Sequence, residues 1–443
     1  MIKKRNRLTG IILAFTMVFT VLFVLPACEI KPYENGSERN EEQYEQEGNG
    51  SDNISDTEES GTTGEPEQGG SDTDTESGED QSGSEYTMPY LTSKQSGSVI
   101  NLIEGDVYEF AAKYEKLRSE KYCDGTDKFA PVPATIEWSY PNPADYYTVN
   151  VSLKKDLTDS ETYVCFYKKL EIEDLFMGKR YYYRITAHKG NDAVRSRVFY
   201  FDTAYLPRTI DVENASNTRD MGGYYTVDGN HRIKQGMIYR GAAPELATAA
   251  GIKKLLNVYG IKTDLDLRGE KPTSAFGDSV KFINISAPYY MNWNGIHYES
   301  FKEAFITEIK AFADPSNYPM YVHCSLGRDR TGTICFLIGA LCGMTERDLY
   351  LDYEMSYLSY WGSFGWDKAE SPTVKVGQFT EMYKYINEGS CLADYPNYYT
   401  LNNKYLNGDE KSLAERTESY LKNYLGIKQS EIDAIRSILI EEI

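Results

Sequence analysis

Two apolar runs flank a short polar loop between residues 320 and 341, and this order of segments leaves few folds open. The first run, Met320-Tyr321-Val322, reads as a buried strand, and the second, from Thr331 to Leu341, reads as a buried helix. A buried strand that runs through a loop into a buried helix is typical of an α/β domain. For residues 206–443 we therefore predict a twisted, mostly parallel sheet flanked by helices.

The loop carries a cysteine and an arginine with five residues between them, in the sequence His323-Cys324-Ser325-Leu326-Gly327-Arg328-Asp329-Arg330-Thr331-Gly332. A tight loop of this length can point its backbone N–H groups inward as an anion nest, and the planar fork of Arg330 can clamp two oxygens. The helix N-terminus adds a favourable field for a phosphate group and for the Cys324 thiolate. We predict a phosphate site in which Cys324 is the nucleophile and Thr331 hydrogen-bonds the sulfur. The predicted phosphate-binding residues are Ser325, Leu326, Gly327, Arg328, Asp329 and Arg330. The alternative is a packed thiol in a basic loop.

Together with other segments, this loop resembles that of the secreted bacterial tyrosine and lipid phosphatases of the dual-specificity type, written HCxxGKDRTG. Further motifs that resemble this family lie at residues 217–224, 236–242, 260–268 and 352–356. The resemblance implies a cysteine-dependent phosphatase that works through a phosphocysteine intermediate, with phosphotyrosine proteins as substrates. The second and third of these motifs are also similar to plant and fungal atypical dual-specificity enzymes, so inositol phosphates or phosphoinositides are the alternative substrates.

The chain departs from the family pattern at two places. Arg328 stands where the family has lysine, which keeps the charge and changes a point donor into a fork suited to a polyanion. The general-acid aspartate of the family is missing from its usual window, which here is residues 289–297. Asp266, at the carboxyl end of the strand predicted for residues 262–267, is the first candidate for the acid, and Asp329 is the second.

The missing acid keeps two other interpretations open. Asp266 can instead be the salt-bridge partner of Arg268 or Arg240, and the whole domain can be a non-catalytic phosphate-binding adhesion module. His323 is expected to fix the loop. Candidates for supporting the loop or touching the substrate are His323, Arg219, Arg240 and Arg268. No HExxH or CxxC pattern accompanies the histidines, so we predict no metal and no cofactor, and we expect no nucleic-acid partner.

The N-terminus predicts export. Four basic residues precede an apolar run from Ile11 to Val24, and residues 25–28 close it as a lipobox. Residues 1–28 are thus expected to be a lipoprotein signal, with Cys28 lipidated and the remainder anchored to the membrane on the bacterial cell surface; an uncleaved signal anchor is the alternative. Residues 29–87 are expected to be a disordered acidic tether, because residues 31–87 hold 18 Asp or Glu against Lys31 and Arg39.

Residues 88–205 show short alternating strands separated by turns, which is typical of an all-β immunoglobulin-like sandwich. This region resembles a fibronectin type III domain, with Trp138 as the buried tryptophan and Tyr181 in a tyrosine corner. We expect a spacer whose ligand or partner the sequence does not name. Whether Cys123 pairs with Cys165 stays open.

Overall fold

The computed structural model describes residues 91–286, 299–363, 371–388 and 412–443. These residues belong to one compact unit that begins at Ser84. The predicted signal with Cys28, the acidic tether and the window at residues 289–297 lie outside the described residues. Within the described ranges, no helix combines the length and the apolar character needed to cross a membrane.

The C-terminal part is built on a five-stranded sheet in the order β10-β12-β15-β13-β14. All neighbours in this sheet run parallel except β10 and β12, which are antiparallel. The predicted α/β domain is therefore confirmed, with one antiparallel edge. The strands are β10 (Arg219–Asp220), β12 (Ile238–Gly241), β13 (Thr263–Asp266), β14 (Lys281–Asn284) and β15 (Met320–His323).

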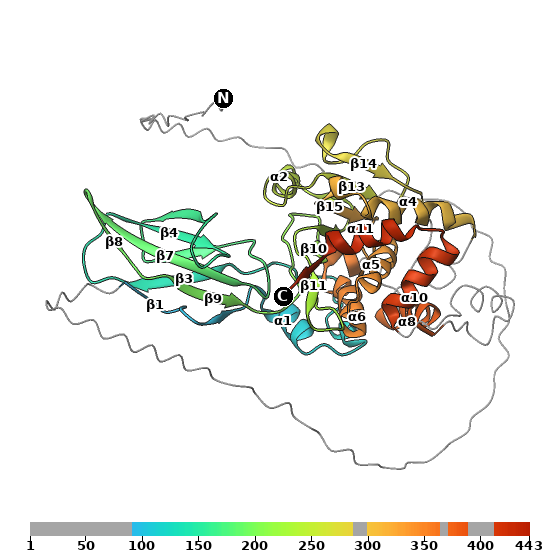
Figure 1. Cartoon of the computed structure of the whole chain (residues 1–443), viewed down its shortest axis with the longest axis horizontal. Helices are drawn as coiled ribbons and strands as arrows, with labels where there is room; N and C mark the ends of the chain where they lie inside the picture. The colour runs from blue at the N-terminus through green and yellow to red at the C-terminus, as the bar shows by residue number, and fades with distance from the viewer. Residues whose placement is uncertain (1–90, 287–298, 364–370, 389–411) are drawn as a thin grey trace, which may run out of the picture. The chain divides into compact units, whose positions relative to one another are not determined.

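Helices cover both faces of this sheet, and its central strands β12, β13 and β15 are buried along their whole length. Tyr239 and Tyr321 share a core with Leu255 of α2 (Ala249–Asn257), whose first turn is capped by the Thr248 side chain. On the other face, Leu265 and Val322 belong to the larger core, which includes buried residues of α4 (Lys302–Phe312) and α5 (Asp329–Leu341). Figure 1 shows these helices around β13 and β15.

Most of the remaining helices contribute side chains to the larger core. They are α6 (Glu346–Glu354), η6 (Met355–Leu358), α7 (Tyr360–Ser363), α8 (Pro372–Glu388), α10 (Leu413–Ser419), the π-helix η8 (Tyr420–Tyr424) and α11 (Gln429–Leu439), with short 3-10 turns η2 (Pro244–Leu246), η3 (Gly277–Ser279), η4 (Glu299–Phe301) and η5 (Pro315–Asn317). Directly after α11, β16 (Ile440–Glu442) pairs antiparallel with β11 (His231–Ile233).

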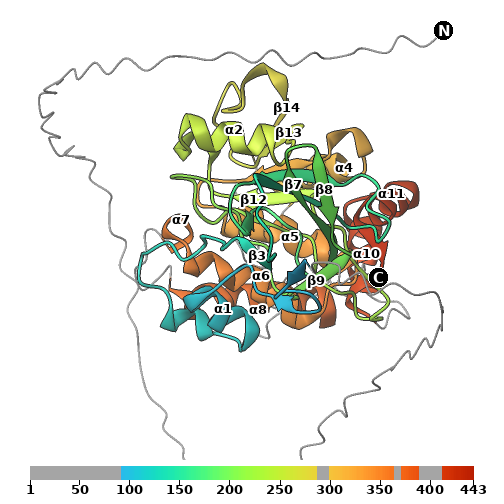
Figure 2. The ribbon, with the colours of Figure 1, turned by 90° about the vertical axis from the view of Figure 1, so that its left-hand side faces the viewer.

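Residues 91–205 form two further sheets, in the orders β1-β3-β6 and β2-β9-β7-β4-β5, with β8 paired to β7. Trp138 of β3 meets Tyr147 of β4 edge to face at 5.2 Å, which joins the two sheets in one core. The Tyr181 hydroxyl accepts a hydrogen bond from the Phe176 N–H, 2.8 Å away. The strands are β1 (Thr92–Ser93), β2 (Val99–Ile100), β3 (Ala134–Ser139), β4 (Tyr146–Ser152), β5 (Glu161–Cys165), β6 (Lys169–Ile172), β7 (Arg180–Lys189), β8 (Asp192–Arg195) and β9 (Phe199–Thr203). Figure 2 shows β3, β7, β8 and β9 from the side.

The connection between β2 and β3 was not predicted as structured. It carries α1 (Gly105–Ala112) and η1 (Arg118–Lys121), and it contacts the C-terminal part of the chain. We call residues 101–133 the β2–β3 excursion.

Candidate active site

The cysteine–arginine loop starts at the carboxyl end of β15 and ends on α5, whose first residue is Asp329. The pairing register places Gly241 and Asp266 on either side of His323, so three strand ends meet directly before Cys324. Gly327 has a φ of +69°, and a Cβ added to it would lie 2.2 Å from the Gly241 carbonyl oxygen. The loop therefore closes against β12 in a way that only glycine permits.

Three successive carbonyls of this loop are held from outside. The Ser325 oxygen accepts from the Ala243 N–H at 3.1 Å, the Leu326 oxygen from the Asn217 side-chain amide at 2.8 Å, and the Gly327 oxygen from Arg240 Nη2 at 2.8 Å. In a trans peptide the C=O and the following N–H point in opposite directions. These three contacts therefore turn the N–H groups of residues 326–328 toward the inside of the loop, which is the arrangement of an anion nest.

The Cys324 thiol lies at the start of this loop and is 4% exposed. Burial raises the pKa of Cys324, but hydrogen bonds from the Thr331 side chain and backbone and the charge of Arg330 outweigh it, so the pKa lies below its ordinary value. The Thr331 hydroxyl is buried, and no described group, the sulfur included, lies in full hydrogen-bond geometry to it. Its effect on Cys324 comes from its closeness to the sulfur. Arg330 donates from Nη1 to the Leu267 carbonyl at 3.1 Å. Cys123, Cys165, Cys335 and Cys342 are free thiols.

His323 is fully buried beneath the loop. Its Nε2 lies 2.8 Å from Asp264 Oδ1, and its Nδ1 lies 3.1 Å from the Cys324 carbonyl oxygen. Burial lowers the pKa of His323, but the Asp264 carboxylate raises it above its ordinary value. Asp264 is fixed in turn by the Ser274 hydroxyl at 2.6 Å. The histidine thus joins the backbone at the start of the loop to Asp264 of β13, a partner that was not predicted from the sequence.

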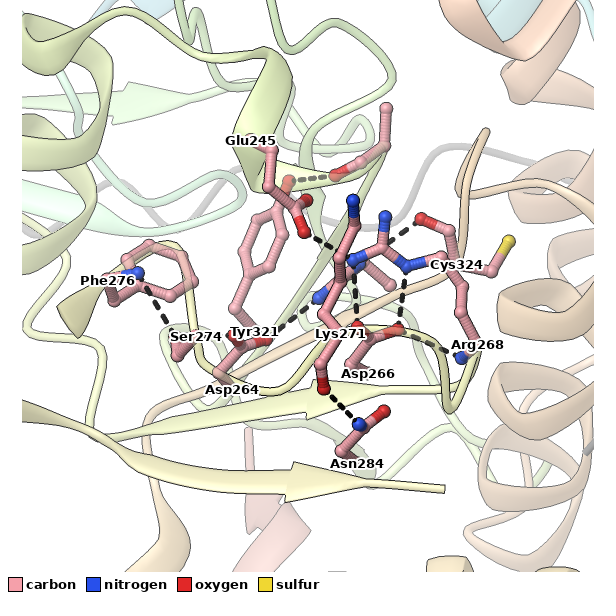
Figure 3. Close-up of polar contacts among 12 residues, drawn as sticks. Glu245, Asp264, Asp266, Arg268, Lys271, Ser274, Phe276, Asn284, Tyr321 and Cys324 are labelled. Atoms are coloured by element: carbon pink, nitrogen blue, oxygen red, sulfur yellow. Dashed lines mark hydrogen bonds and ion pairs between the residues drawn. The ribbon is translucent and has the colours of Figure 1, made fainter. Parts of the chain in front are cut away.

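Asp266, the first candidate for the acid, is joined to Arg268. Arg268 donates to the two carboxylate oxygens of Asp266 from Nε and Nη2, both at 2.8 Å, and its Nη2 also reaches Glu245 Oε1 at 2.6 Å. Figure 3 shows these contacts in the same view as Cys324. Burial raises the pKa of Asp266, but Arg268 and His323 outweigh it and lower the pKa below its ordinary value. The geometry is that of the salt-bridge alternative.

Arg219 and Arg240 are both fully buried and share one carboxylate. Arg219 Nε donates to Asp352 Oδ1 at 3.0 Å, and Arg240 Nη1 makes a short ion pair with Asp352 Oδ2. Burial raises the pKa of Asp352, but the two guanidinium groups lower it below its ordinary value. Of the two roles considered for these arginines, supporting the loop and touching the substrate, this geometry fits the first, because both lie behind the loop.

The Arg328 side chain is also buried, which corrects its predicted contact with a polyanion. Only 1% of Arg328 is exposed, and its guanidinium donates to Asp329 and to the Gly362 carbonyl at 2.9 Å and lies over the Tyr357 ring at 5.3 Å. Asp329 also accepts from the Tyr353 hydroxyl at 3.2 Å. Arg328 can serve a phosphate through its backbone N–H, while its side chain anchors the loop.

Three supporting residues were not singled out as site residues from the sequence: Glu245, Asp264 and Asp352. Asp352 lies in a segment that resembles a family motif, but its partners are far away in the sequence. Asp264 could have been found from the sequence, because a charged residue in the short buried strand β13 needs a buried partner. Glu245 follows β12 and carried no such signal.

Comparison with known proteins gives one family match. A sequence model of the family described as "Tyrosine phosphatase family" matches residues 210–441. This range includes the whole cysteine–arginine loop and every strand of the five-stranded sheet.

Similar proteins cover the same region at low identity. A protein designated a tyrosine-protein phosphatase in Cupriavidus necator is 27% identical over 166 residues, which is 32% of this chain and 60% of the relative. A protein with the same designation from Meyerozyma guilliermondii is 28% identical over 26% of this chain and 65% of the relative. A third, from Dictyostelium discoideum, is 28% identical over 22% of this chain and 57% of the relative. The chain thus spans less than two thirds of the length of each of these relatives.

Proposed function

Because this chain belongs to the tyrosine phosphatase family, we propose that it hydrolyses phosphomonoesters through a phosphocysteine intermediate, with phosphotyrosine in proteins as its substrate. The observation that carries the proposal is the outward anchoring of the Ser325, Leu326 and Gly327 carbonyls. A loop fixed in this way presents N–H donors to an anion without reorganising, which is the condition for stabilising a charged transition state.

The reaction follows from the positions of the loop residues. The Cys324 thiolate attacks phosphorus, a sulfur–phosphorus bond forms, and the bond to the leaving oxygen breaks while the loop N–H groups and Arg330 hold the phosphoryl oxygens. Water then attacks phosphorus, and the sulfur leaves as a thiolate. The Thr331 hydroxyl, buried beside the sulfur, favours this departure because it stabilises the negative charge.

The choice of phosphotyrosine rests on the leaving group. Asp266 lies against the Arg268 side chain, which favours the ionised carboxylate over the proton donor. Asp329 accepts hydrogen bonds from the Arg328 side chain. A phenol, with a pKa near 10, leaves with less help from an acid than an alkyl alcohol does. Inositol phosphates are the second candidates, and the burial of the Arg328 side chain removes one argument for them.

We also propose that the enzyme acts outside the cell, held to the membrane by a lipid on Cys28. The support is the sequence of residues 1–28, a basic start followed by an apolar run that ends in a lipobox. Incorporation of labelled fatty acid in cells tests this proposal, with Cys28→Ser as the variant that should lose the label. The sandwich region is proposed to be of the fibronectin type III kind, on the basis of its alternating strands.

The activity is tested by phosphate release from a phosphotyrosine peptide and from inositol hexakisphosphate under reducing conditions. We expect the full chain to prefer the peptide and Cys324→Ser to be inactive, whereas Cys335→Ser, which changes another buried thiol, retains activity. Release that survives in Cys324→Ser contradicts the mechanism. Tight binding of the phosphopeptide by the wild type without turnover favours the phosphate-binding module instead.

A further inference from the structure

The β2–β3 excursion leaves the sandwich after β2 and returns to it at β3. Its base is closed by a hydrogen bond from the Val132 N–H to the Leu102 carbonyl at 2.9 Å. Figures 1 and 2 both show α1 beside α6, and Arg347 of α6 donates to the Ala111 carbonyl at 3.0 Å. The excursion precedes residue 210, where the family match begins, so the family does not explain why it lies there.

The main attachment of the excursion is a buried carboxylate at the end of α6. Glu354 is fully buried, and its Oε1 accepts from the Tyr114 hydroxyl at 2.6 Å and from the Leu117 N–H at 3.0 Å. Its Oε2 accepts from the Ser119 hydroxyl at 2.6 Å. Leu117 has a φ of +66°, a conformation that a leucine seldom adopts. The excursion thus supplies three close hydrogen-bond donors to the Glu354 carboxylate. One of these donors, the Leu117 N–H, belongs to a residue in the left-handed conformation.

Other residues of the segment that carries Glu354 contact or support the cysteine–arginine loop. Asp352 holds Arg240, which in turn holds the Gly327 carbonyl. Tyr353 donates to Asp329, and the Tyr357 ring lies beneath the Arg328 guanidinium. Residues 352–357 therefore contact the loop directly at two points and support it at a third through Arg240, while Glu354 is fixed by the excursion.

Two further contacts extend the same support. The Lys128 N–H donates to the Leu358 carbonyl at 2.9 Å. The Phe129 ring is buried, and the Arg219 guanidinium lies over it at 5.8 Å. Arg219 shares Asp352 with Arg240, so the end of the excursion reaches the residues that anchor the loop from behind.

We propose that the β2–β3 excursion is a positioning element of the active site, which fixes residues 352–358 through Glu354 and thereby holds the cysteine–arginine loop in its phosphate-binding shape. Tyr114 and Ser119 are its positioning residues. A buried carboxylate takes the position that its donors define, because it cannot exchange them for water. The inference rests on the proposed phosphatase function, and it makes the sandwich region a working part of the enzyme instead of a spacer.

The test uses the full chain with Tyr114→Phe and Ser119→Ala combined, which removes two donors to Glu354 and leaves the aromatic ring in place. We expect kcat for the phosphotyrosine peptide to fall by about tenfold or more, since small displacements of catalytic groups are costly. The pH midpoint for alkylation of Cys324 by iodoacetamide should rise as well. Lys113→Ala is the matched control, because it removes an exposed ion pair with Glu109, 3.0 Å long, from the same excursion. Tyr114→Phe alone is the milder variant if the double variant does not fold.

The proposal is overturned if a folded double or single variant keeps both the wild-type kcat and the wild-type alkylation profile. If the wild type releases no phosphate but the excursion variants still raise the pH midpoint for alkylation of Cys324, the positioning role is supported and the proposed function is removed. If the wild type is active and needs Cys324, but the excursion variants have the same kcat and alkylation profile as Lys113→Ala, only the positioning role is removed.

Discussion

Asp266 and Arg268 lie two residues apart and are joined by a two-point ion pair, with Arg268 Nε and Nη2 each 2.8 Å from a carboxylate oxygen. The pair lies at the end of β13, next to His323 and the start of the cysteine–arginine loop. A carboxylate in such a fork is stabilised in its ionised form, and the lowered pKa of Asp266 agrees with this. Its geometry suits a residue that orients Arg268 more than one that delivers a proton.

Asp266→Asn separates these two roles. Loss of a general acid costs about 10²–10⁴ in rate, whereas loss of one contact to Arg268 should cost less than about tenfold. We expect the smaller loss in kcat, with the alkaline limb of the pH–rate profile retained. Asp278→Asn, at an exposed position of η3, is the control. If Asp266→Asn lowers kcat by a hundredfold or more and also abolishes the alkaline limb of the pH–rate profile, Asp266 is the general acid.

Thr331→Val tests the stabilisation of the thiolate. The Thr331 hydroxyl favours the charged sulfur, so its removal should raise the pKa of Cys324 and slow alkylation by iodoacetamide at a given pH below that pKa. A hydrogen bond to a charged group contributes about 1.5–3 kcal/mol, which corresponds to a shift of about one to two pH units. Thr331→Ser, which keeps a hydroxyl, should restore most of the wild-type profile. An unchanged midpoint in Thr331→Val would show that the hydroxyl does not act on the sulfur.

The charged cluster behind the loop gives a prediction about stability. Asp352→Asn leaves Arg219 and Arg240 buried without their shared anion, which should reduce the free energy of unfolding by about 3–5 kcal/mol. Urea unfolding measures this. Glu137→Gln, in an exposed ion pair with Lys94, is the control and should leave the free energy of unfolding close to that of the wild type.

The same cluster gives a pH dependence with a definite sign. The pKa of Asp352 in the folded state lies below its ordinary value, so its contribution to stability is complete above the unfolded pKa of about 3.9 and is lost as the pH falls through the folded value. The difference in stability between the wild type and Asp352→Asn should therefore be constant from about pH 5 to 8 and shrink below about pH 4. A difference that grows on acidification would contradict this account.

The parts of the fold that could be predicted are those with a local signal. The apolar runs on either side of Cys324 predict β15 and α5, and the spacing of Cys324 and Arg330 predicts the loop between them. The partners of the arginines could not be predicted in the same way. The spacing identifies Arg330 as the clamp, but it does not show that the Arg328 side chain is turned into the core by Asp329 and Gly362 while Arg330 stays at the loop. Such choices depend on contacts between segments distant in the sequence, as does the attachment of the excursion to Glu354, over 230 residues away.

The close approach of the loop to β12 gives the last prediction. Gly327 and Gly260 both have left-handed backbone, with φ of +69° and +65°, but a Cβ at Gly327 would meet the Gly241 backbone at 2.2 Å whereas one at Gly260 would meet nothing within 4 Å. Both changes to alanine carry the conformational cost, about 1–2 kcal/mol, and only Gly327→Ala must also move the loop. We expect Gly260→Ala to keep its activity with a modest loss in Tm, and Gly327→Ala to lose about a hundredfold in kcat/KM. Equal activities in the two variants, measured on the phosphotyrosine peptide, would show that contact with β12 does not set the shape of the loop.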